Sequence, residues 1–461
     1  MLVYRSTTKN NKLIKLAQVH YDAGRLKEAL SLFRQVLDDE PKHLNALVSL
    51  TEMSLELGQV DGAASLILRA LASEPFDKSC LLILDKIIDA LEEKGTQAQL
   101  IFEYSQILKE NGYWDEALYK HRQALRLDPA LADTDNFDSI SLLARGDIEK
   151  GWLAFEWRST IGSLGKFTDK VWNGENLSGQ TILVMGEQGV GDQIMFSTCL
   201  QDIIEIAKHV IIGVDDRLVT LFQRSFPKAV VEGVARYTAD GKIFVQDFNW
   251  LQKHPQIDFF VLQGSLGRFF RPSVESFPSQ SQRLLGAPER LKNWKQKLAQ
   301  LGPGKKIGIS WRSHLLERQS RCYPELSLWQ PLFNIKSAHF ICLQAGVTSE
   351  EVQIMKKSFG VDIFILNEID LVEDLDELAA LCGSLDCVVT TRVSLQWLAA
   401  AVGTPVWSIA RGQYEDEWCM LGLEHYPWFP EMNVCLAKTD DLLRSSFHRV
   451  AREIALQAEE A

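Results

Sequence analysis

Apolar and small residues in the first third of the chain recur at an offset of 34 residues. The matched pairs are Gly24 and Gly58, Ala29 and Ala63, and Pro41 and Pro75. The same frame returns over residues 112–129 and again over residues 146–155. Between Pro75 and Pro129 the chain holds one such period and an extra segment, so we expect residues 78–95 to form an additional helix.

This period is typical of tetratricopeptide repeats, in which small residues let two antiparallel helices approach and a proline ends the second helix. We therefore predict an α-solenoid over residues 1–160, with a right-handed superhelical course. Stacked repeats commonly bind a protein or peptide partner in their groove, and the alternative is a rigid packing or dimerisation module. Tyr21, Tyr104, Tyr119 and His121 are candidates to line such a groove, or else belong to the core.

After residue 180 the pattern changes to short apolar runs that alternate with amphipathic helical segments. Strand and helix in alternation predict parallel sheets with helices on both faces. We expect a junction over residues 161–180, a first Rossmann-like half over 181–302, and a second half over 303–461 that ends in a helix. A Gly-Pro-Gly-Lys-Lys segment separates the two halves.

The first strand, TILVM, runs into a glycine loop with Gln188, Gly189 and Gly191, and Asp192 opens the following helix. Backbone N–H groups at such a helix start attract an anionic group, and glycines let a ligand approach. The loop is not a P-loop, because no Lys-Ser/Thr pair follows the glycines. A dinucleotide-binding oxidoreductase is one interpretation, with Asp215 as the ribose contact, but Ile194 stands at the third glycine position.

Asp192 itself has two interpretations. It is placed to act as a general base that removes a proton from an attacking hydroxyl. It is equally suited to cap the helix that it opens. The residue alone favours the cap, and a base role needs other evidence.

Candidate phosphate contacts follow strands of the second half. Arg312, Arg318 and Arg321 lie in the loop after KIGISW, where a doubly wound sheet presents its ligand-binding edge. Guanidinium groups bind a phosphate through paired hydrogen bonds, although arginines in such a loop also pair with neighbouring carboxylates. Ser394 begins a small-residue helix whose N-terminus favours an anion.

Charge and cysteine content narrow the function classes. A formal net charge of -12 argues against nucleic-acid binding through a basic face. The eight cysteines show neither C-x-x-C nor zinc-type spacing, which predicts buried thiols in a reducing compartment. We find no signal peptide, no membrane-spanning stretch and no Asp-x-Asp motif, so we expect a cytoplasmic protein without a metal or other cofactor.

Several stretches resemble one family. WNGENLSGQTILVMGEQGVGDQIMFS, GISWR followed by SRCYP, FICLQAG with Gln344, and LAAAVGTPVW stand in the order found in the heptosyltransferase-like domain that follows tetratricopeptide repeats in bacterial proteins. The resemblance implies a GT-B fold of two Rossmann-like domains behind the repeats. Some members are implicated in flagellin glycosylation, and the layout is similar to that of O-GlcNAc transferase.

The resemblance also implies residue roles. Asp192 matches the proposed catalytic base, Arg312 or Arg321 the basic residue near the donor phosphate, and the turn from Thr391 the nucleotide-binding turn. This chain departs from the family at Arg392 and Trp397, where many relatives have an aspartate and a histidine.

Together these observations predict an inverting glycosyltransferase that moves a sugar from a nucleotide-activated donor onto a protein Ser/Thr hydroxyl, with flagellin as the expected acceptor. Asp192 would be the catalytic base. The predicted donor-site residues are Arg312, Arg318, Arg321, Gln344, Thr391, Arg392 and Ser394, and the predicted loop residues are Gln188, Gly189 and Gly191. The alternative is a catalytically inert repeat scaffold.

Overall fold

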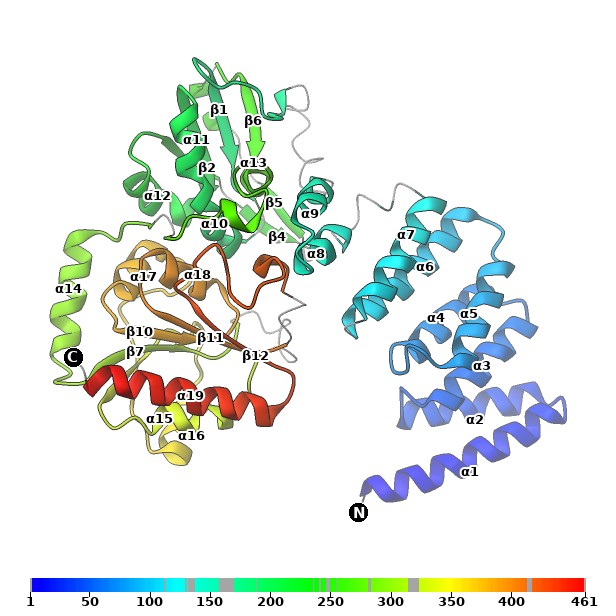
Figure 1. Ribbon diagram of the computed structural model, residues 1–461. Helices are drawn as coiled ribbons and strands as arrows, with labels where there is room; N and C mark the ends of the chain where they lie inside the picture. Colours follow the sequence, from blue (N-terminus) through cyan, green and yellow to red (C-terminus); the bar gives the residue numbers. More distant parts are fainter. Residues whose placement is uncertain are drawn as a thin grey trace. The chain divides into compact units, whose positions relative to one another are not determined.

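A computed structural model divides the chain into two compact units, Met1–Ser141 and Leu142–Ala461, which are described separately (Figure 1). The structure describes residues 2–111, 113–128, 131, 137–156, 170–187, 189–234, 236–239, 242–245, 249–254, 256–280, 283–313, 323–412 and 417–459.

Paired helices build the N-terminal unit. They are α1 (Leu2–Asp22), α2 (Leu26–Asp39), α3 (Leu44–Glu56), α4 (Val60–Leu71), α5 (Lys78–Ala90), α6 (Lys94–Glu110) and α7 (Trp114–Leu127). α1 packs on α2, α3 on α4, and α6 on α7. Gly24 and Gly58 follow α1 and α3 with φ of +71° each, a left-handed conformation that glycine adopts without steric cost. α5 packs on α4 outside these three pairs, which confirms the additional helix expected from the period, although it ends at Ala90 and not at residue 95.

Small residues at the repeat positions form the centre of each helix pair. Ala29 and Ala63 are fully buried, beside Phe33 and Ile67 one turn further along their helices. Their small side chains let the paired helices approach closely, as the repeat pattern predicts. Tyr21 donates a hydrogen bond to Glu56, and this bond, with partial burial, raises the pKa of the tyrosine to about 12.

The last repeat-like segment belongs to the C-terminal unit. The division falls within α8 (Phe137–Ala144), and α9 (Ile148–Phe155) packs in the α/β core through the buried Trp152 and Phe155. The indole of Trp152 donates a hydrogen bond of 2.8 Å to the Arg271 carbonyl. The repeat pattern therefore continues past the end of the N-terminal unit.

The first sheet has the order β3-β2-β1-β6, with all strands parallel. Its strands are β1 (Thr181–Met185), β2 (His209–Asp215), β3 (Val230–Val234) and β6 (Phe259–Leu262), and its helices are α10 (Val190–Phe196), α11 (Leu200–Ile206), α12 (Val219–Ser225) and α13 (Leu266–Phe270). The sequence predicts these four strands. The antiparallel hairpin of β4 (Arg236–Ala239) and β5 (Lys242–Val245) was not predicted.

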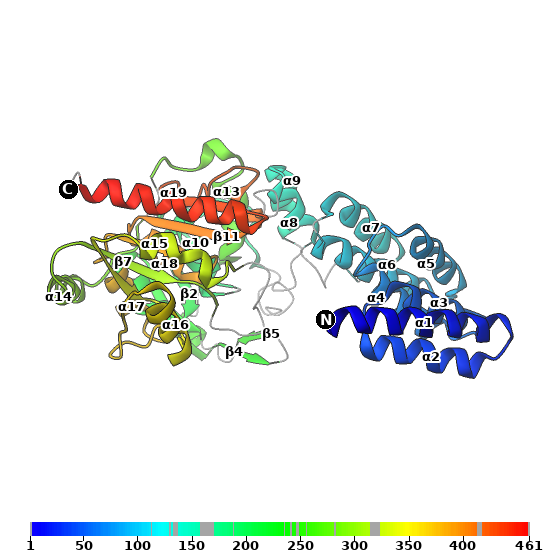
Figure 2. The same ribbon diagram turned by 90° about the horizontal axis from the view of Figure 1, so that it is seen from below.

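The second sheet has the order β12-β11-β10-β7-β8-β9, again all parallel. Its strands are β7 (Lys305–Ser310), β8 (Ala338–Cys342), β9 (Ile363–Phe364), β10 (Cys387–Thr390), β11 (Val406–Arg411) and β12 (Asn433–Ala437). Its helices are α14 (Pro288–Ala299), α15 (Gln330–Phe333), α16 (Ser349–Phe359), α17 (Leu375–Cys382), α18 (Ser394–Ala401) and α19 (Asp440–Glu459). α19 packs on β11 and β12, and Figure 2 shows it beside β11.

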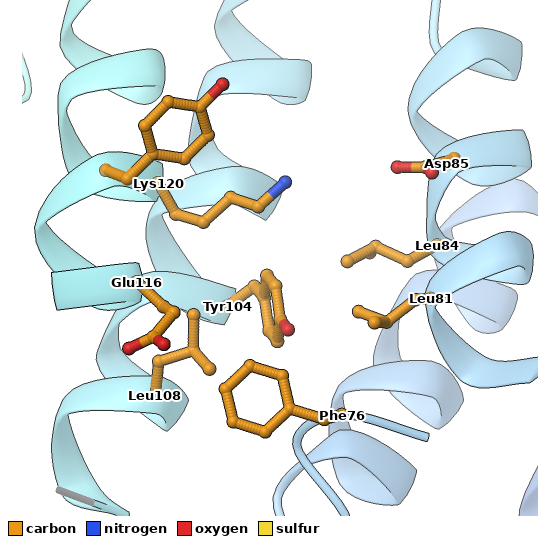
Figure 3. A pocket seen from close by; sticks show the side chains of 9 residues that line it. Phe76, Leu81, Leu84, Asp85, Tyr104, Leu108, Glu116 and Lys120 are labelled. Carbon is orange, nitrogen blue, oxygen red and sulfur yellow. The ribbon is translucent and has the colours of Figure 1, made fainter. Parts of the chain in front are cut away.

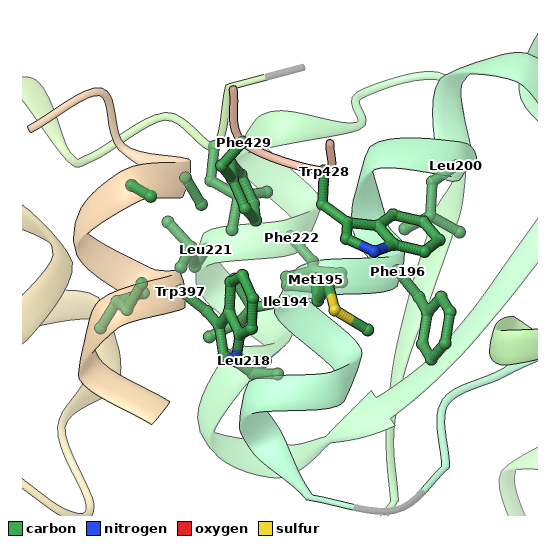
Figure 4. Packing of buried hydrophobic residues seen from close by; sticks show 14 of the residues in the cluster. Ile194, Met195, Phe196, Leu200, Leu218, Leu221, Phe222, Trp397, Trp428 and Phe429 are labelled. Carbon is green, nitrogen blue, oxygen red and sulfur yellow. The ribbon is translucent and has the colours of Figure 1, made fainter. Parts of the chain in front are cut away.

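An apolar interface joins the two α/β halves. α10 packs directly against α18, and Trp397 extends from α18 toward the helix that carries Ile194 (Figure 4). Trp428 and Phe429 close the same cluster, and all of these side chains are at least nine-tenths buried. Arg224 of α12 also pairs with Asp376 of α17. The predicted order of a helical repeat array followed by two Rossmann-like sheets is confirmed.

Candidate functional site

The glycine loop after β1 ends in a capped helix. Gly189 is the N-cap of α10, and its backbone N–H donates a hydrogen bond of 3.1 Å to Oδ2 of Asp192. A carboxylate at the third helical position that bonds back to the N-cap N–H satisfies a donor that the helix leaves unpaired. The structure therefore shows the capping contact for Asp192. Gln188 lies outside the described residues.

Buried polar side chains fix this loop to the neighbouring strands. Gln193, 1% exposed, accepts a hydrogen bond of 3.0 Å from the Asp215 N–H at the end of β2. Gln263, after β6, donates a bond of 2.9 Å to the Gln193 carbonyl. Glu187, 2% exposed, accepts a bond of 2.9 Å from the Gly264 N–H. Sequence analysis missed these residues, although polar side chains within buried apolar strings are a signal for them.

A second strand-to-helix turn lies between β10 and α18. Thr391 is fully buried and its N–H donates to the Ser310 carbonyl at 3.2 Å. Its hydroxyl has no hydrogen-bond partner among the described residues. Arg392 forms an ion pair with Glu417, and both side chains are largely buried. Nothing in the sequence marks Glu417 as a residue of this turn, because its partner, Arg392, lies far away along the chain.

The two turns meet at the interface of the halves. A Cβ atom added to Gly191 would lie 3.3 Å from Oγ of Ser394 and 3.0 Å from Cδ1 of Trp397. The small residues at the start of these helices therefore allow α10 and α18 to approach each other. Ser394 itself is exposed.

Cys419 lies within electrostatic reach of both turns. Burial raises the pKa of its thiol well above the usual value, and the negative charges of Glu417 and Asp192 add to the effect, while Arg392 opposes it. Its Sγ is 3.6 Å from Oε1 of Glu417. The predicted base, Asp192, and one predicted phosphate contact, Arg392, thus both influence the pKa of this buried thiol.

Arg312 is held by the carboxylate of Glu351, a residue of α16. Its Nε and Nη2 donate to the two carboxylate oxygens of Glu351 at 2.7 and 2.8 Å, and Nη2 also donates to the Gly346 carbonyl at 2.9 Å. Glu351 belongs to the capping box of α16 with Thr348. The T-x-x-E spacing of that box was visible in the sequence. Arg318 and Arg321 lie outside the described residues.

The charge of Glu351 is stabilised by this network. Partial burial opposes its ionisation, but hydrogen bonds from Arg312, from the Thr348 N–H and from the Trp311 indole outweigh that effect and lower its pKa to about 2. The pair therefore stays ionised at neutral pH.

Gln344, after β8, organises the same loop from within. It is 1% exposed, and its Oε1 accepts hydrogen bonds from the N–H groups of Trp311 and Arg312, both at 3.0 Å, and from the Ser310 hydroxyl at 3.2 Å. It therefore positions the chain at the carboxyl end of β7. In this structure its side chain holds the loop through these hydrogen bonds.

Asp215 is engaged by a neighbouring arginine. Its carboxylate accepts hydrogen bonds from Nε and Nη2 of Arg217 at 2.8 and 2.9 Å, and from the Arg217 N–H at 3.1 Å. A ribose contact would need these same oxygens. The geometry therefore gives no support to the oxidoreductase interpretation.

Other expectations can be compared with the described part of the chain. Its cysteines are free thiols in buried positions: Cys80, Cys199, Cys342, Cys382, Cys387, Cys419 and Cys435. Among the described residues, no group of three or more His, Cys, Asp or Glu side chains could hold a metal ion. No helix in the described ranges has the length and apolar character needed to cross a membrane.

Comparison with known proteins first defines the N-terminal class. Residues 20–85 match the tetratricopeptide repeat family. Over 318 residues the chain is 32% identical to Protein FlbA of Caulobacter vibrioides (strain ATCC 19089 / CIP 103742 / CB 15), a match that covers 67% of this chain and 53% of that relative. The chain thus spans about half the length of this curated relative.

Solved structures similar to the chain include glycosyltransferases. A glycosyl transferase family 9 protein from Veillonella parvula DSM 2008 has a TM-score of 0.45 and 10% identity, covering 62% of this chain and 100% of its own. E. coli ADP-heptose LPS heptosyltransferase II has a TM-score of 0.42 and 12% identity, covering 61% and 100%. A Thermobaculum terrenum O-GlcNAc transferase mutant has a TM-score of 0.31 and 14% identity, and the match covers 99% of this chain and 93% of the transferase chain. Scores of this size do not by themselves define an activity.

Proposed function

We propose that the chain is an inverting glycosyltransferase of the cytoplasm, which moves a sugar from a nucleotide-activated donor onto a Ser/Thr hydroxyl of a protein held by the repeats. Flagellin is the acceptor that the family resemblance suggests. The proposal needs neither a metal nor another cofactor, because arginines near the donor turn can neutralise a departing phosphate. Nucleic acid has no part in it.

The observation that carries the proposal is the convergence of Asp192 and Arg392. Each follows a parallel strand of a different sheet, and ligands of open α/β sheets bind outside the carboxyl ends of such strands. The contact of Gly191 with Ser394 and Trp397 brings the two turns together. The buried, unbonded hydroxyl of Thr391 also supports a polar ligand at this turn, since such groups ordinarily have a partner.

The reaction places these groups in defined roles. Asp192 accepts the proton of the acceptor hydroxyl, the hydroxyl oxygen bonds to the anomeric carbon, and the bond from that carbon to the donor phosphate breaks. The phosphate leaves with its electron pair and its negative charge. Arg392 stabilises that charge, with the predicted assistance of Arg312 and Arg321.

A second candidate function, an inert scaffold, also has specific support. Asp192 caps its own helix, Arg392 pairs with Glu417, and Arg312 pairs with Glu351. In a scaffold these contacts would be purely structural. The two functions differ in whether a nucleotide binds and in whether Asp192 is needed for more than stability.

The deciding experiment begins with nucleotide binding by the full chain. Calorimetry and thermal shift with UDP, GDP, ADP and CMP test for a donor site, and we expect one nucleotide to bind selectively. The matching nucleotide sugar is then incubated with flagellin and either the wild-type protein or the Asp192→Asn variant. Transfer of the sugar is measured as an increase in the intact mass of flagellin. Asparagine can still cap the helix, so the variant should fold and bind nucleotide.

We expect Asp192→Asn to lower transfer by about a hundredfold or more, the usual contribution of a general base. Asp362→Asn is the matched control, because the same substitution there falls on a side chain that is 80% exposed. Undiminished transfer by Asp192→Asn would remove the base role. A folded wild-type protein that binds none of the nucleotides would favour the scaffold.

A further inference from the structure

A pocket of about 400 Å³ lies in the N-terminal unit, between α5 on one side and α6 and α7 on the other (Figure 3). It occurs where the extra helix interrupts the pairing of repeats. α5 packs mainly on α4, and the face that carries Leu81, Leu84 and Asp85 lines the pocket opposite α6 and α7. The size is sufficient for a large side chain and part of its neighbour.

The floor of the pocket is apolar. Leu81 and Leu84 of α5 point toward the ring of Tyr104, with Leu108 beside it (Figure 3). Tyr104 is 2% exposed and its hydroxyl donates to the Pro75 carbonyl at 2.8 Å. The polar end of the tyrosine is thus satisfied within the protein, and its buried ring forms part of the apolar floor of the pocket.

The rim of the pocket is charged, with acidic groups in excess. Asp85 and Glu116 make no ion pair within the described residues. Lys120 lies with Nζ 5.9 Å from the centre of the Tyr104 ring, and Figure 3 shows its ammonium and the Asp85 carboxylate facing the same opening. Two carboxylates against one ammonium favour a ligand that carries a positive charge.

Exposed aromatic side chains extend this surface beyond the pocket. Phe76 and Tyr119 line its edge and are 43% and 58% exposed, and Tyr113, 40% exposed, packs edge-on against Phe76 at 4.6 Å between ring centres. Aromatic residues are enriched where proteins bind other proteins. A surface wider than the pocket itself fits an extended protein segment.

We infer that this pocket binds a protein segment that inserts an apolar side chain over Tyr104 and places a neighbouring lysine or arginine beside Asp85 and Glu116. The binding of the segment is independent of any transfer reaction. Only the identification of the segment with the acceptor rests on the proposed function.

The test is a selection from a phage-displayed library of random dodecapeptides on the full-length protein. We expect selected peptides to share an apolar residue next to a basic residue. Their affinity, measured by fluorescence polarisation, should fall about tenfold on Phe76→Ala, the size expected for loss of an interface anchor. Asp85→Lys and Glu116→Lys should each weaken binding by a similar factor, more strongly at low salt.

Matched controls lie on the same unit. Leu82→Ala removes an apolar side chain of α5 that is 64% exposed and outside the pocket, and Asp38→Lys makes the same charge reversal on α2. Both should leave peptide affinity unchanged. Circular dichroism of every variant checks that the helices are retained.

Three outcomes would overturn the inference. The first is a selection that yields no peptide. The second is a set of peptides whose affinity is unchanged by Phe76→Ala and by Asp85→Lys. The third is a dimer of the chain that dissociates when Asp85→Lys is introduced. The last would place a second copy in the pocket. Because no donor is present, these outcomes do not depend on glycosyl transfer.

Discussion

Gly191 of α10 packs directly against Trp397 of α18, so that a Cβ atom at position 191 would lie 3.0 Å from the indole Cδ1. Trp397 also packs against Tyr426 and Phe429, with ring centres at 4.7 and 5.9 Å. The indole therefore has little room to move. This contact joins the two turns that carry the candidate catalytic groups.

We expect Gly191→Ala to lower the free energy of unfolding by about 1 to 3 kcal/mol, because overpacking forces the surrounding groups to shift. Trp397→Ala removes the obstructing ring, so Gly191→Ala should cost much less in that background. Urea unfolding of the four combinations, followed by circular dichroism, gives the coupling energy. Additive effects would show that the two residues do not interact.

This contact also shows where sequence analysis reaches its limit. The strands β1 and β2 could be predicted, because buried parallel strands are continuous apolar runs, and α5 followed from the interrupted repeat period. Sequence analysis also singled out Gly191. The sequence could suggest only that its glycine lets a ligand approach, whereas the structure shows that a distant tryptophan occupies this space.

The candidate site was partly predictable for the same reason. Asp192 was named because it opens a helix after a strand and a glycine loop, which is a local property, and Arg392 was named through the family resemblance of its turn. Their surroundings were not, since the pairing of Arg392 with Glu417 and of Arg312 with Glu351 depends on which loops the fold brings together. Long-range ion pairs leave no periodic signal in a single sequence.

Glu351 gives a prediction about pH. Its pKa in the folded protein, about 2, lies below the ordinary value of 4.5, so its ionised form stabilises the fold at any pH above the ordinary value. That contribution is lost as the pH falls from about 4.5 toward 2. We expect Glu351→Gln to lower the free energy of unfolding by about 2 kcal/mol at pH 7, with a difference from wild type that narrows below about pH 4.5.

The measurement is urea unfolding of wild type and Glu351→Gln at pH 7, 5.5 and 4.5, and lower where the protein stays folded. Glu350→Gln is the matched control, because Glu350 is the exposed neighbour on the same helix turn. A difference that stays constant as the pH falls below 4.5 would contradict the assigned pKa.

Gln344 should be essential for the order of the loop after β7. Gln344→Leu keeps the volume of the side chain but leaves the Trp311 and Arg312 N–H groups without their acceptor. Unsatisfied buried donors of this kind cost about 2 to 4 kcal/mol in total. Urea unfolding should show this loss, and the same substitution at the exposed Gln353 of α16 should not. Equal stabilities of the two variants would contradict the role assigned to Gln344.

Arg392 and Glu417 distinguish a donor site from a structural ion pair. If Arg392 contacts the donor phosphate, Arg392→Ala should weaken nucleotide binding about tenfold, as expected for loss of a charge-assisted contact. Glu417→Gln should act in the opposite direction, because it releases the guanidinium from a competing carboxylate. Calorimetry with the nucleotide selected in the binding panel measures both changes.

Arg411→Ala is the control for this pair. Arg411 is the last residue of β11, and its carbonyl accepts a hydrogen bond from Arg392. Its own side chain pairs with Asp440 and not with Glu417. We expect the Arg411→Ala variant to be somewhat less stable than the wild type and to bind the nucleotide with unchanged affinity. If Arg392→Ala and Glu417→Gln behave in the same way as Arg411→Ala, the ion pair is structural. Arg392 then provides no phosphate contact, and a donor would have to be bound by other residues of the second half.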